Sequence, residues 1–482
     1  MPKKPGRTRR TAAKQKSAAS KRDRKHPVPT TDTATGTPGA RATANARATV
    51  RVYRQGLGDC ILVRLKRENA DDFKILIDCG VAVATQDAPA TMKMVMENIV
   101  QATGGKVDVL AVTHGHWDHV SGFSQAEDVF KRLEVGEVWV AWTEDEADDL
   151  AKTLRDHHAR AVAAVGDSAQ ALAMAGRADR AHDILNVLGL LGAAGEKTKA
   201  AFDIAKAKAQ PGQKPRYWRP KDAPFQVPDS DIRVYALGPP YDAKLIRKVL
   251  PSPSHPETYE FALDGGGFFP LGVTSALDFN NNDDVPFADA WMIPMERARG
   301  MTFFQNHYWG TLGEGADWRR IDTDWLGLAD DLALALQSAT NNTSLVLAVE
   351  LGGGDVLLFA GDAQVGNWLS WQDRKWPEEN PTATGPALLE RTIFYKVGHH
   401  GSHNATLRAE GLEQMTNLRT AVIPVDREVA LKMRWGAMPL DSLVAALEEK
   451  TKGRALQTDK TKTPQKPLDG ITVTDLYYDI AV

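Results

Sequence analysis

The stretch Thr113-His114-Gly115-His116-Trp117-Asp118-His119 brings three imidazoles and one carboxylate together within a few positions of the chain. It follows residues 107–112, a run rich in valine that predicts a buried strand. Catalytic groups commonly lie on loops at strand ends, where a rigid sheet holds them in place. Neutral imidazole and carboxylate are good ligands for zinc and similar divalent metals. The stretch therefore predicts a metal site just past the end of a strand.

The spacing within this cluster predicts two metal positions rather than one. In an extended backbone His114 and His116 point the same way, because side chains alternate along the chain. Asp118 and His119 come after the turn and can face a second position. The alternative is a polar loop whose histidines are merely solvated, and four ligand-type residues in this order argue against it.

The order His-x-His-x-Asp-His after a strand resembles the signature of the metallo-β-lactamase-fold hydrolases. The resemblance implies an α/β fold, an αββα sandwich of two mixed β-sheets flanked by helices, with a metal site along one edge. Two earlier motifs, Gly-Leu-Gly-Asp ending at Asp59 and Ile-Asp-Cys-Gly around Asp78, look like the opening motifs of this family. The resemblance implies that Asp78 supports the site without binding metal, and we place Asp59 with it as structural support.

Three later motifs resemble the competence-protein (ComEC-type) branch of the family, which has phosphocholine-esterase relatives. They are Asn-Thr-Ser-Leu-Val-Leu from Asn342, Leu-Leu-Phe-Ala-Gly-Asp-Ala around Asp362, and His-His-Gly-Ser from His399. The resemblance implies that Asp362 bridges two metals and that one of His399 and His400 completes one of them. We assign His400 to the metal and His399 to catalysis, and the reverse assignment stays open from the sequence.

The resemblance implies two divalent metal ions, with zinc as the first choice and manganese as the second. The implied ligands are His114, His116, Asp118, His119, Asp362 and His400. Many family members have a further metal-binding histidine between the first cluster and the bridging aspartate. None of the candidates for that ligand in this chain has the family's sequence setting. These candidates are His157, His158, His182, His255 and His307. The metal held by His114, His116 and Asp362 should therefore be bound more loosely.

The chemistry that follows from two such metals is attack by a shared hydroxide. The hydroxide forms from a bound water whose pKa the metals lower to about neutrality. The candidate catalytic residues are Asp118, His399 and His403. Of these, His399 or His403 would hydrogen-bond a substrate oxygen or protonate the leaving group. The candidate substrate-binding residues are Asn342, Ser344 and Ser402. They either hold phosphate oxygens or buttress the loops.

The function that these motifs imply is metal-dependent hydrolysis by a dinuclear-metal-activated hydroxide, in a phosphodiesterase or nuclease. That substrate class comes from the resemblance to the competence-protein branch, whose full members also carry membrane channel segments that this sequence lacks. Hydrolysis of a thioester, lactone or lactam at the same centre is one alternative, and a non-hydrolytic iron oxygenase is a remoter one. An alternative from a different class is a binding or scaffold protein with a vestigial metal site.

The composition is typical of a soluble globular protein, because 43% of the 482 residues are hydrophobic and 25% are charged. The net charge of -3 gives no overall attraction to nucleic acid or to an anionic membrane. No apolar run is long enough to span a bilayer, and the N-terminus lacks the apolar core of a signal peptide. We therefore expect a cytoplasmic location without a membrane partner, and the sequence leaves the oligomeric state open.

The chain divides into a basic tail, residues 1–46, and one hydrolase domain, residues 47–482. The tail clusters lysine and arginine and cannot form a core, so we expect it to be disordered. It either binds a nucleic-acid or other phosphodiester partner, because clustered cations release counterions on binding phosphate, or is a solvated appendage. The domain should carry a helical insertion at about 144–210 and a loop-rich insertion at about 241–325, followed by a helix at 325–338.

The two cysteines, Cys60 and Cys79, do not make a disulfide framework in a chain of this length. Residues 61–65 and 74–79 predict a hairpin joined by a polar turn. In such a hairpin Cys60 and Cys79 lie nearly opposite each other. We expect both to be reduced and packed beside the site.

Overall fold

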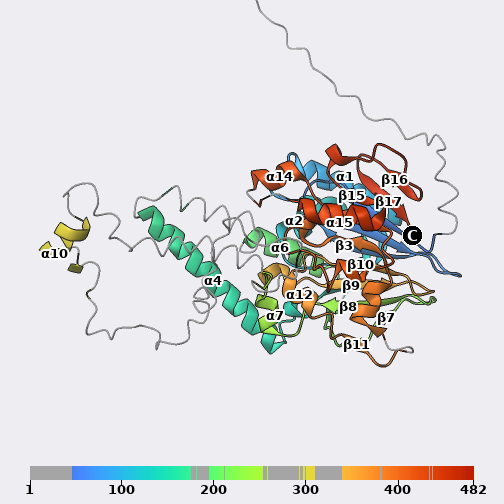
Figure 1. The fold of residues 1–482 in the computed structure, drawn as a ribbon, viewed down its shortest axis with the longest axis horizontal. Coiled ribbons are helices and arrows are strands. Elements are labelled where there is room, and N and C mark those ends of the chain that lie inside the picture. Colours follow the sequence, from blue (N-terminus) through green and yellow to red (C-terminus); the bar gives the residue numbers. More distant parts are fainter. Residues whose placement is uncertain are drawn as a thin grey trace, which may run out of the picture.

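The computed structural model of the chain describes residues 46–174, 195–210, 212–252, 301–309, 339–379, 383–433 and 438–482, together with a few isolated positions between these ranges. The predicted basic tail, the second part of the helical insertion, most of the loop-rich insertion and the helix predicted at 325–338 lie outside the described residues. The described residues form two large mixed sheets that pack face to face, with helices on both outer sides (Figure 1).

The first sheet has eight strands, in the order β16-β17-β1-β2-β3-β4-β5-β6. They are β1 (Ala48–Tyr53), β2 (Cys60–Leu65), β3 (Phe73–Cys79), β4 (Lys106–Ala111), β5 (Glu134–Ala141), β6 (Arg216–Trp218), β16 (Ile471–Val473) and β17 (Tyr477–Ala481). β2 and β3 pair antiparallel, which confirms the predicted hairpin, whereas β3, β4, β5 and β6 run parallel. β4 lies inside this parallel array, where strands are buried on both faces, and its valines suit that position.

The second sheet has seven strands, in the order β15-β14-β13-β10-β9-β8-β7. They are β7 (Phe225–Gln226), β8 (Arg233–Gly238), β9 (Val346–Glu350), β10 (Val356–Phe359), β13 (Thr392–Lys396), β14 (Thr420–Ile423) and β15 (Ala455–Gln457). β10, β13, β14 and β15 run parallel, so their carboxyl ends share one edge. A small separate sheet pairs β11 (Lys375–Trp376) with β12 (Ala383–Thr384).

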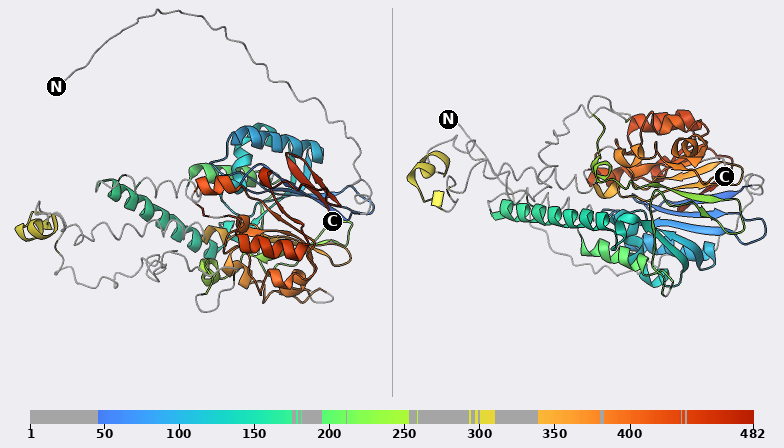
Figure 2. Two further views of the ribbon diagram at one scale, coloured as in Figure 1. Left: turned by 45° about the horizontal axis from the view of Figure 1, so that its top comes forward. Right: turned by 90° about the horizontal axis from the view of Figure 1, so that it is seen from below.

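Helices cover the outer face of each sheet. Over the first sheet lie α1 (Ala88–Thr103), α2 (Trp117–Gln125), α3 (Glu127–Phe130) and α6 (Glu196–Lys206). Over the second lie α12 (Val365–Leu369), α13 (Gly385–Glu390), α14 (Arg427–Lys432) and α15 (Asp441–Thr451). α7 (Ala243–Arg247) contacts α12, and α4 (Asp149–Met174) extends away from the sandwich (Figure 2).

Short helical turns complete the described part of the chain. They are α10 (Thr302–Phe304), η2 (Trp142–Glu144), η5 (Gln305–Trp309), η8 (Gly398–Gly401), η9 (Leu412–Gln414) and η10 (Lys460–Lys462). Within the described ranges, no helix combines the length and the apolar character needed to cross a membrane.

Three apolar layers hold the sandwich together, one between the sheets and one under each set of helices. β9 and β10 show why some strands are apolar throughout. Leu347 and Leu357 face the layer between the sheets, while Ala348 and Leu358 face the layer under the helices. A strand that is buried on both faces has no polar side. This αββα arrangement confirms the predicted fold.

The predicted helical insertion has two parts with different surroundings. α4 carries His157 and His158, both half-buried, while His182 lies outside the described residues. α6 packs against α2, and Phe202 on α6 belongs to the apolar layer of the first sheet. α6 is therefore part of the helical layer next to the predicted site rather than an appendage.

The two cysteines lie opposite each other in the β2–β3 pair, as the predicted hairpin requires. Both Cys60 and Cys79 are buried and unbridged. Burial, and then the hydrogen bond with Cys79, raises the pKa of the Cys60 thiol well above its usual value. A thiol that stays protonated is a poor nucleophile, so Cys60 fills space where the hairpin enters the site.

Candidate metal centre

The predicted ligands come from loops at the carboxyl ends of parallel strands in both sheets. The cluster at 114–119 follows β4, Asp362 follows β10 and His400 follows β13. The backbone N–H of Leu345 donates to the carbonyl of Thr113 (2.8 Å), which joins the two sheets at this edge. The centre therefore lies where the edges of the two sheets meet, in the usual place for a site on parallel strands.

The backbone changes conformation within the first cluster. His116 is extended (φ -102°, ψ 151°) directly before α2, whereas Asp118 and His119 occupy the first turn of that helix. This change turns Asp118 and His119 toward a different position from that of His114 and His116. A carboxylate in the first turn also suits the positive end of the helix.

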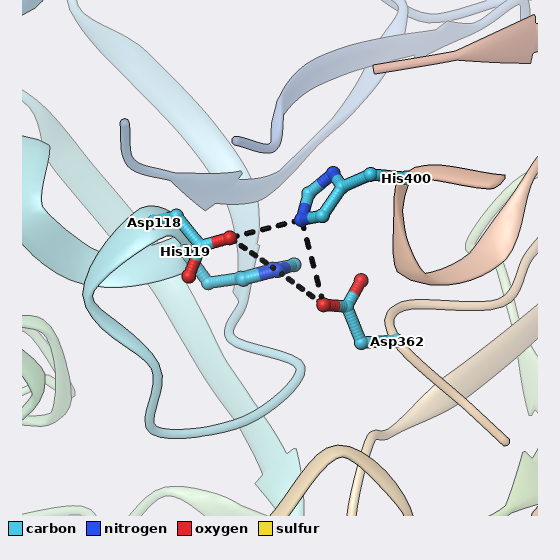
Figure 3. A group of neighbouring side chains, drawn as sticks. All are labelled: Asp118, His119, Asp362 and His400. Atoms are coloured by element: carbon cyan, nitrogen blue, oxygen red, sulfur yellow. Dashed lines mark hydrogen bonds and ion pairs between the residues drawn. The ribbon is translucent and has the colours of Figure 1, made fainter. Parts of the chain in front are cut away.

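The six predicted ligand side chains lie together in two groups that share Asp362. One group is Asp118, His119, Asp362 and His400 (Figure 3), and the other is His114, His116 and Asp362. Within each group the ligand-type atoms lie within 4.8 Å of one another, and every member is buried. Two groups with a common carboxylate are an arrangement suited to two neighbouring ions.

One oxygen of Asp362 is the point on which the imidazoles converge. Its Oδ2 lies 3.2 Å from His119 Nε2, 3.6 Å from His400 Nε2 and 4.0 Å from His114 Nε2. His400 Nε2 also lies 2.9 Å from Asp118 Oδ2. Figure 3 shows the four side chains of the first group pointing toward one another. A single oxygen therefore faces imidazoles of both groups.

Two buried imidazole nitrogens, His116 Nε2 and His119 Nε2, have no hydrogen-bond partner among the described residues. Buried polar atoms are normally paired, because an unpaired one costs about 1–3 kcal/mol. His114 Nε2 and His116 Nδ1 hydrogen-bond to each other at 2.9 Å, a contact that metal coordination by His114 would replace. Zinc and manganese accept imidazole and carboxylate ligands. The residues present therefore fit divalent metal ions.

Hydrogen bonds behind the ligands fix which nitrogen each imidazole presents. His119 Nδ1 donates to Asp78 Oδ2 (2.8 Å). Asp78 also accepts from the backbone N–H (2.8 Å) and the hydroxyl (2.7 Å) of Thr113. His400 Nδ1 donates to the carbonyl of Pro424 (2.7 Å). Both rings therefore turn Nε2, which is unprotonated in the neutral imidazole, toward the site.

Asp59, Asp78 and His119 form a third close group, which we interpret as support for the ligands rather than as another ion site. The His119 atom that faces these carboxylates is Nδ1, which already donates to Asp78. Asp59 Oδ2 forms an ion pair with the ammonium group of Lys396. Burial opposes the charge of Lys396, but Asp59 and then Asp362 raise its pKa above the usual value. The carboxylates of this third group are therefore already engaged, Asp78 by His119 and Asp59 by Lys396.

Burial and neighbouring charges set the protonation states of the ligands. Burial lowers the pKa of His114 well below its usual value and that of His116 to about 4, so both rings are neutral at pH 7. Burial alone would raise the pKa of Asp118, but the nearby imidazoles, His119 foremost, lower it to about 2. Burial also opposes a charge on His119, yet four carboxylates, led by Asp362, raise its pKa well above normal. A divalent cation would take over the role of the proton that His119 holds among these carboxylates.

Part of the chain matches a known protein family. Residues 53–138 match the metallo-beta-lactamase superfamily. This metallo-beta-lactamase segment runs from the end of β1 into β5 and contains Asp59, Asp78 and the cluster at 114–119. Together with the two ligand groups, it supports a metal-dependent hydrolase. No curated protein and no solved structure matches the chain.

The His399–His400 pair has an unusual backbone, and its two rings face different partners. Both residues have positive φ (41° and 52°), as does Gly401 (77°). Positive φ strains residues that carry a side chain, and such strain is concentrated at functional sites. His400 faces Asp118, whereas the ring of His399 hydrogen-bonds outside the ligand groups. Of the pair, His400 is the one that the structure brings to the ligands.

The hydrogen bonds of Asn404 and Ser402 favour the tautomer of His399 that carries its proton on Nδ1. Asn404 Nδ2 donates to the carbonyl of Val249 (2.9 Å), so Asn404 Oδ1 faces Ser402 and accepts its hydroxyl proton (2.9 Å). Ser402 Oγ then accepts from His399 Nδ1 (2.6 Å), which leaves the lone pair of His399 Nε2 facing the amide of Asn341 (3.0 Å). Burial lowers the pKa of His399 to about 4, and the residue is 9% exposed. His399 is therefore a neutral acceptor beside the ligands.

The remaining predicted site residues differ in their contacts. The side-chain amide of Asn342 donates to three backbone carbonyls at 245–248 and is wholly buried. Ser344 Oγ accepts from the backbone N–H of Asp362 (3.0 Å). For Asn342 and Ser344 these contacts favour buttressing, one of the two predicted roles. His403 is exposed on the surface.

Three buried residues beside the ligands were not predicted from the sequence: Asn341, Gln364 and Lys396. Lys396 ends the strand Thr-Ile-Phe-Tyr-Lys, and a lysine in a buried strand is a signal that could have identified an internal ion pair. Asn341 and Gln364 contact the two nitrogens of His399 (3.0 and 3.2 Å). Their sequence context does not distinguish them from ordinary loop residues.

Proposed function

We propose that this protein is a metal-dependent phosphodiesterase whose site holds two divalent ions, with zinc as the first choice and manganese as the second. The observation that carries the proposal is the pair of ligand groups that share Asp362. The preference for phosphodiesters, including nucleic acids, comes from the motifs that resemble the competence-protein (ComEC-type) branch, among them His-His-Gly-Ser from His399.

Each ligand group would hold one ion. The residues for one ion are His114 and His116, those for the other are Asp118, His119 and His400, and Asp362 would serve both. The bound ions would supply Lewis acidity toward a phosphoryl oxygen and make water a nucleophile at neutral pH. Asp78 would keep His119 in the tautomer that presents Nε2.

His399 would act on the reactants as a proton acceptor. Its Nδ1 proton is engaged by Ser402, so the group available for exchange is the Nε2 lone pair. A hydroxyl or water that displaces the amide of Asn341 from Nε2 could pass its proton to the ring. The low pKa of His399 keeps this acceptor unprotonated at pH 7.

Two exposed cations on α7, a helix that contacts the loop at Asn342, favour an anionic substrate. The side chain of Asn342 binds carbonyls at 245–248 and also accepts from the backbone N–H of Gln364 (3.0 Å), so α7 lies against the loops that carry the ligands. Lys244 and Arg247 on α7 are exposed. Exposed cations at this position would attract the phosphate groups of a substrate.

The test of the proposed function is a substrate panel with protein loaded with zinc or manganese. We expect turnover of a generic phosphodiester and of nucleic acid, its loss with a chelator, and its return when metal is restored. His399→Ala should keep its metal content and lose about 10²- to 10⁴-fold in kcat, the usual contribution of a proton-transfer group. Turnover confined to thioesters, lactones or lactams would show that the protein hydrolyses one of these substrates and is not a phosphodiesterase. Two bound ions without turnover of any substrate would favour a scaffold.

We propose further that the basic tail is a nucleic-acid-binding arm of this enzyme. Deleting residues 1–46 should leave turnover of a small phosphodiester intact, weaken binding of nucleic acid and flatten its salt dependence. The double variant Lys244→Glu/Arg247→Glu tests the α7 cations in the same way. It should raise KM for nucleic acid and leave KM for a small phosphodiester unchanged. Binding that stays the same across a salt titration would reduce the tail to a solvated appendage.

A further inference from the structure

Lys396 lies beneath the metal ligands as a fully buried cation, 1% exposed at the end of β13. Its Nζ donates to the carbonyl of Gly361 (2.8 Å) and forms an ion pair with Asp59 Oδ2. Asp362 Oδ1 lies 3.6 Å from the same nitrogen. One ammonium group therefore lies next to both a support residue and the shared ligand.

Four buried carboxylates crowd the volume around this ammonium group. They are Asp59, Asp78, Asp118 and Asp362. Within the described part of the chain, Lys396 is the one ammonium or guanidinium group that pairs with any of them. Carboxylates so close repel one another in a low-dielectric interior, and a carboxylate left unpaired there is destabilising. Lys396 therefore offsets part of the negative charge whether or not ions are bound.

The two oxygens of Asp362 have different partners. Oδ1 accepts from the backbone N–H of His399 (3.1 Å) and faces Lys396, while Oδ2 faces the imidazoles. Ser344 holds the backbone N–H of the same residue (3.0 Å). Lys396 thus attracts Oδ1 away from the ligand groups and leaves Oδ2 turned toward them.

We propose that Lys396, paired with Asp59, is a positioning residue that orients Asp362 so that one carboxylate oxygen serves both ligand groups. This inference rests on the proposed two-ion centre. Without the ammonium group the Asp362 carboxylate could rotate, and repulsion among the carboxylates would increase. Replacing Lys396 should therefore weaken metal binding. Breaking an ion pair elsewhere in the protein should lower stability alone.

The test compares Lys396→Met with the double variant Asp59→Asn/Lys396→Met in the full chain. The single substitution leaves Asp59 buried and unpaired, so the metal-free protein should unfold at a lower temperature or fail to fold. The double variant removes both charges and should recover the fold. It should still bind zinc about 10- to 100-fold more weakly than wild type, the range for partners behind a metal ligand. Competition with a chromophoric chelator measures the affinity, and the visible absorption of cobalt(II)-substituted protein reports the ligand geometry.

The matched control is the ion pair of Arg51 with Asp479, which joins β1 and β17. Arg51→Met/Asp479→Asn should lower stability without changing zinc affinity or the cobalt spectrum. The positioning role is overturned if Asp59→Asn/Lys396→Met keeps wild-type zinc affinity and spectrum, or if this double variant does not fold. Neither measurement uses turnover. A wild-type protein that hydrolyses nothing would therefore end the proposed function and leave the result on Lys396 standing.

Discussion

Asp362→Ala should release both metal ions and abolish hydrolysis of every substrate. Asp362 is the side chain that the two ligand groups share, so its loss takes one ligand and one negative charge from each ion. Metal content by mass spectrometry and turnover of a generic phosphodiester measure the two effects. Asp373→Ala is the matched control, because Asp373 is exposed and belongs to neither group. The control should keep both ions and the full rate.

His116→Ala gives a graded comparison with that variant. His116 belongs to the smaller group alone, so its loss should leave about one ion per chain and remove most of the rate, since two-ion chemistry needs both. Two ions retained by Asp362→Ala would contradict the shared-ligand geometry. Loss of both ions from His116→Ala would instead mean that the ions bind only as a pair.

Gly80→Ala should displace the metal ligands although Gly80 binds no metal itself. A Cβ at this position would lie 2.4 Å from the backbone carbonyl of Asp118 and 2.5 Å from the backbone nitrogen of His119. Both are backbone atoms, so the first turn of α2 would have to shift. Overpacking of this kind costs about 1–3 kcal/mol. A displacement of about 1 Å at a catalytic group can cost roughly 100-fold in rate. We therefore expect weaker zinc binding and about 100-fold lower kcat/KM.

Gly166→Ala is the control for this substitution. Gly166 lies on α4, and a Cβ there would meet nothing within 4 Å. Alanine should leave metal binding unchanged and raise the stability of that helix slightly, because it has the higher helix propensity. Wild-type zinc affinity and rate in Gly80→Ala would show that the close contact between β3 and α2 does not set the ligand positions.

The fold and the six metal-ligand candidates could be predicted because their signals are local. The cluster at 114–119, the Gly-Asp around Asp362 and the His-His-Gly-Ser from His399 each follow a readable strand. Since the carboxyl ends of parallel strands share an edge, three such segments are expected to meet. The same holds for Cys60 and Cys79, whose pairing follows from the hairpin.

The remaining features depend on contacts between distant parts of the chain. The choice of His400 over His399 follows from the contact of His400 with Asp118 and of His399 with Ser402, and the sequence pattern carries no sign of it. The pairing of Lys396 with Asp59 needs the two sheets to be docked. α6 has an apolar stripe that a solvent-facing insertion could also show, so its place against α2 became clear only from the packing.

Asp118 and His400, which touch at 2.9 Å, lie 282 positions apart in the chain. Bringing such distant positions together costs chain entropy, which the packing of the two sheets must offset. The centre therefore exists only after β4 of the first sheet and β13 of the second have come together. An ion held by ligands from both sheets ties them to each other, so a metal-starved cell would contain protein whose two sheets separate more readily.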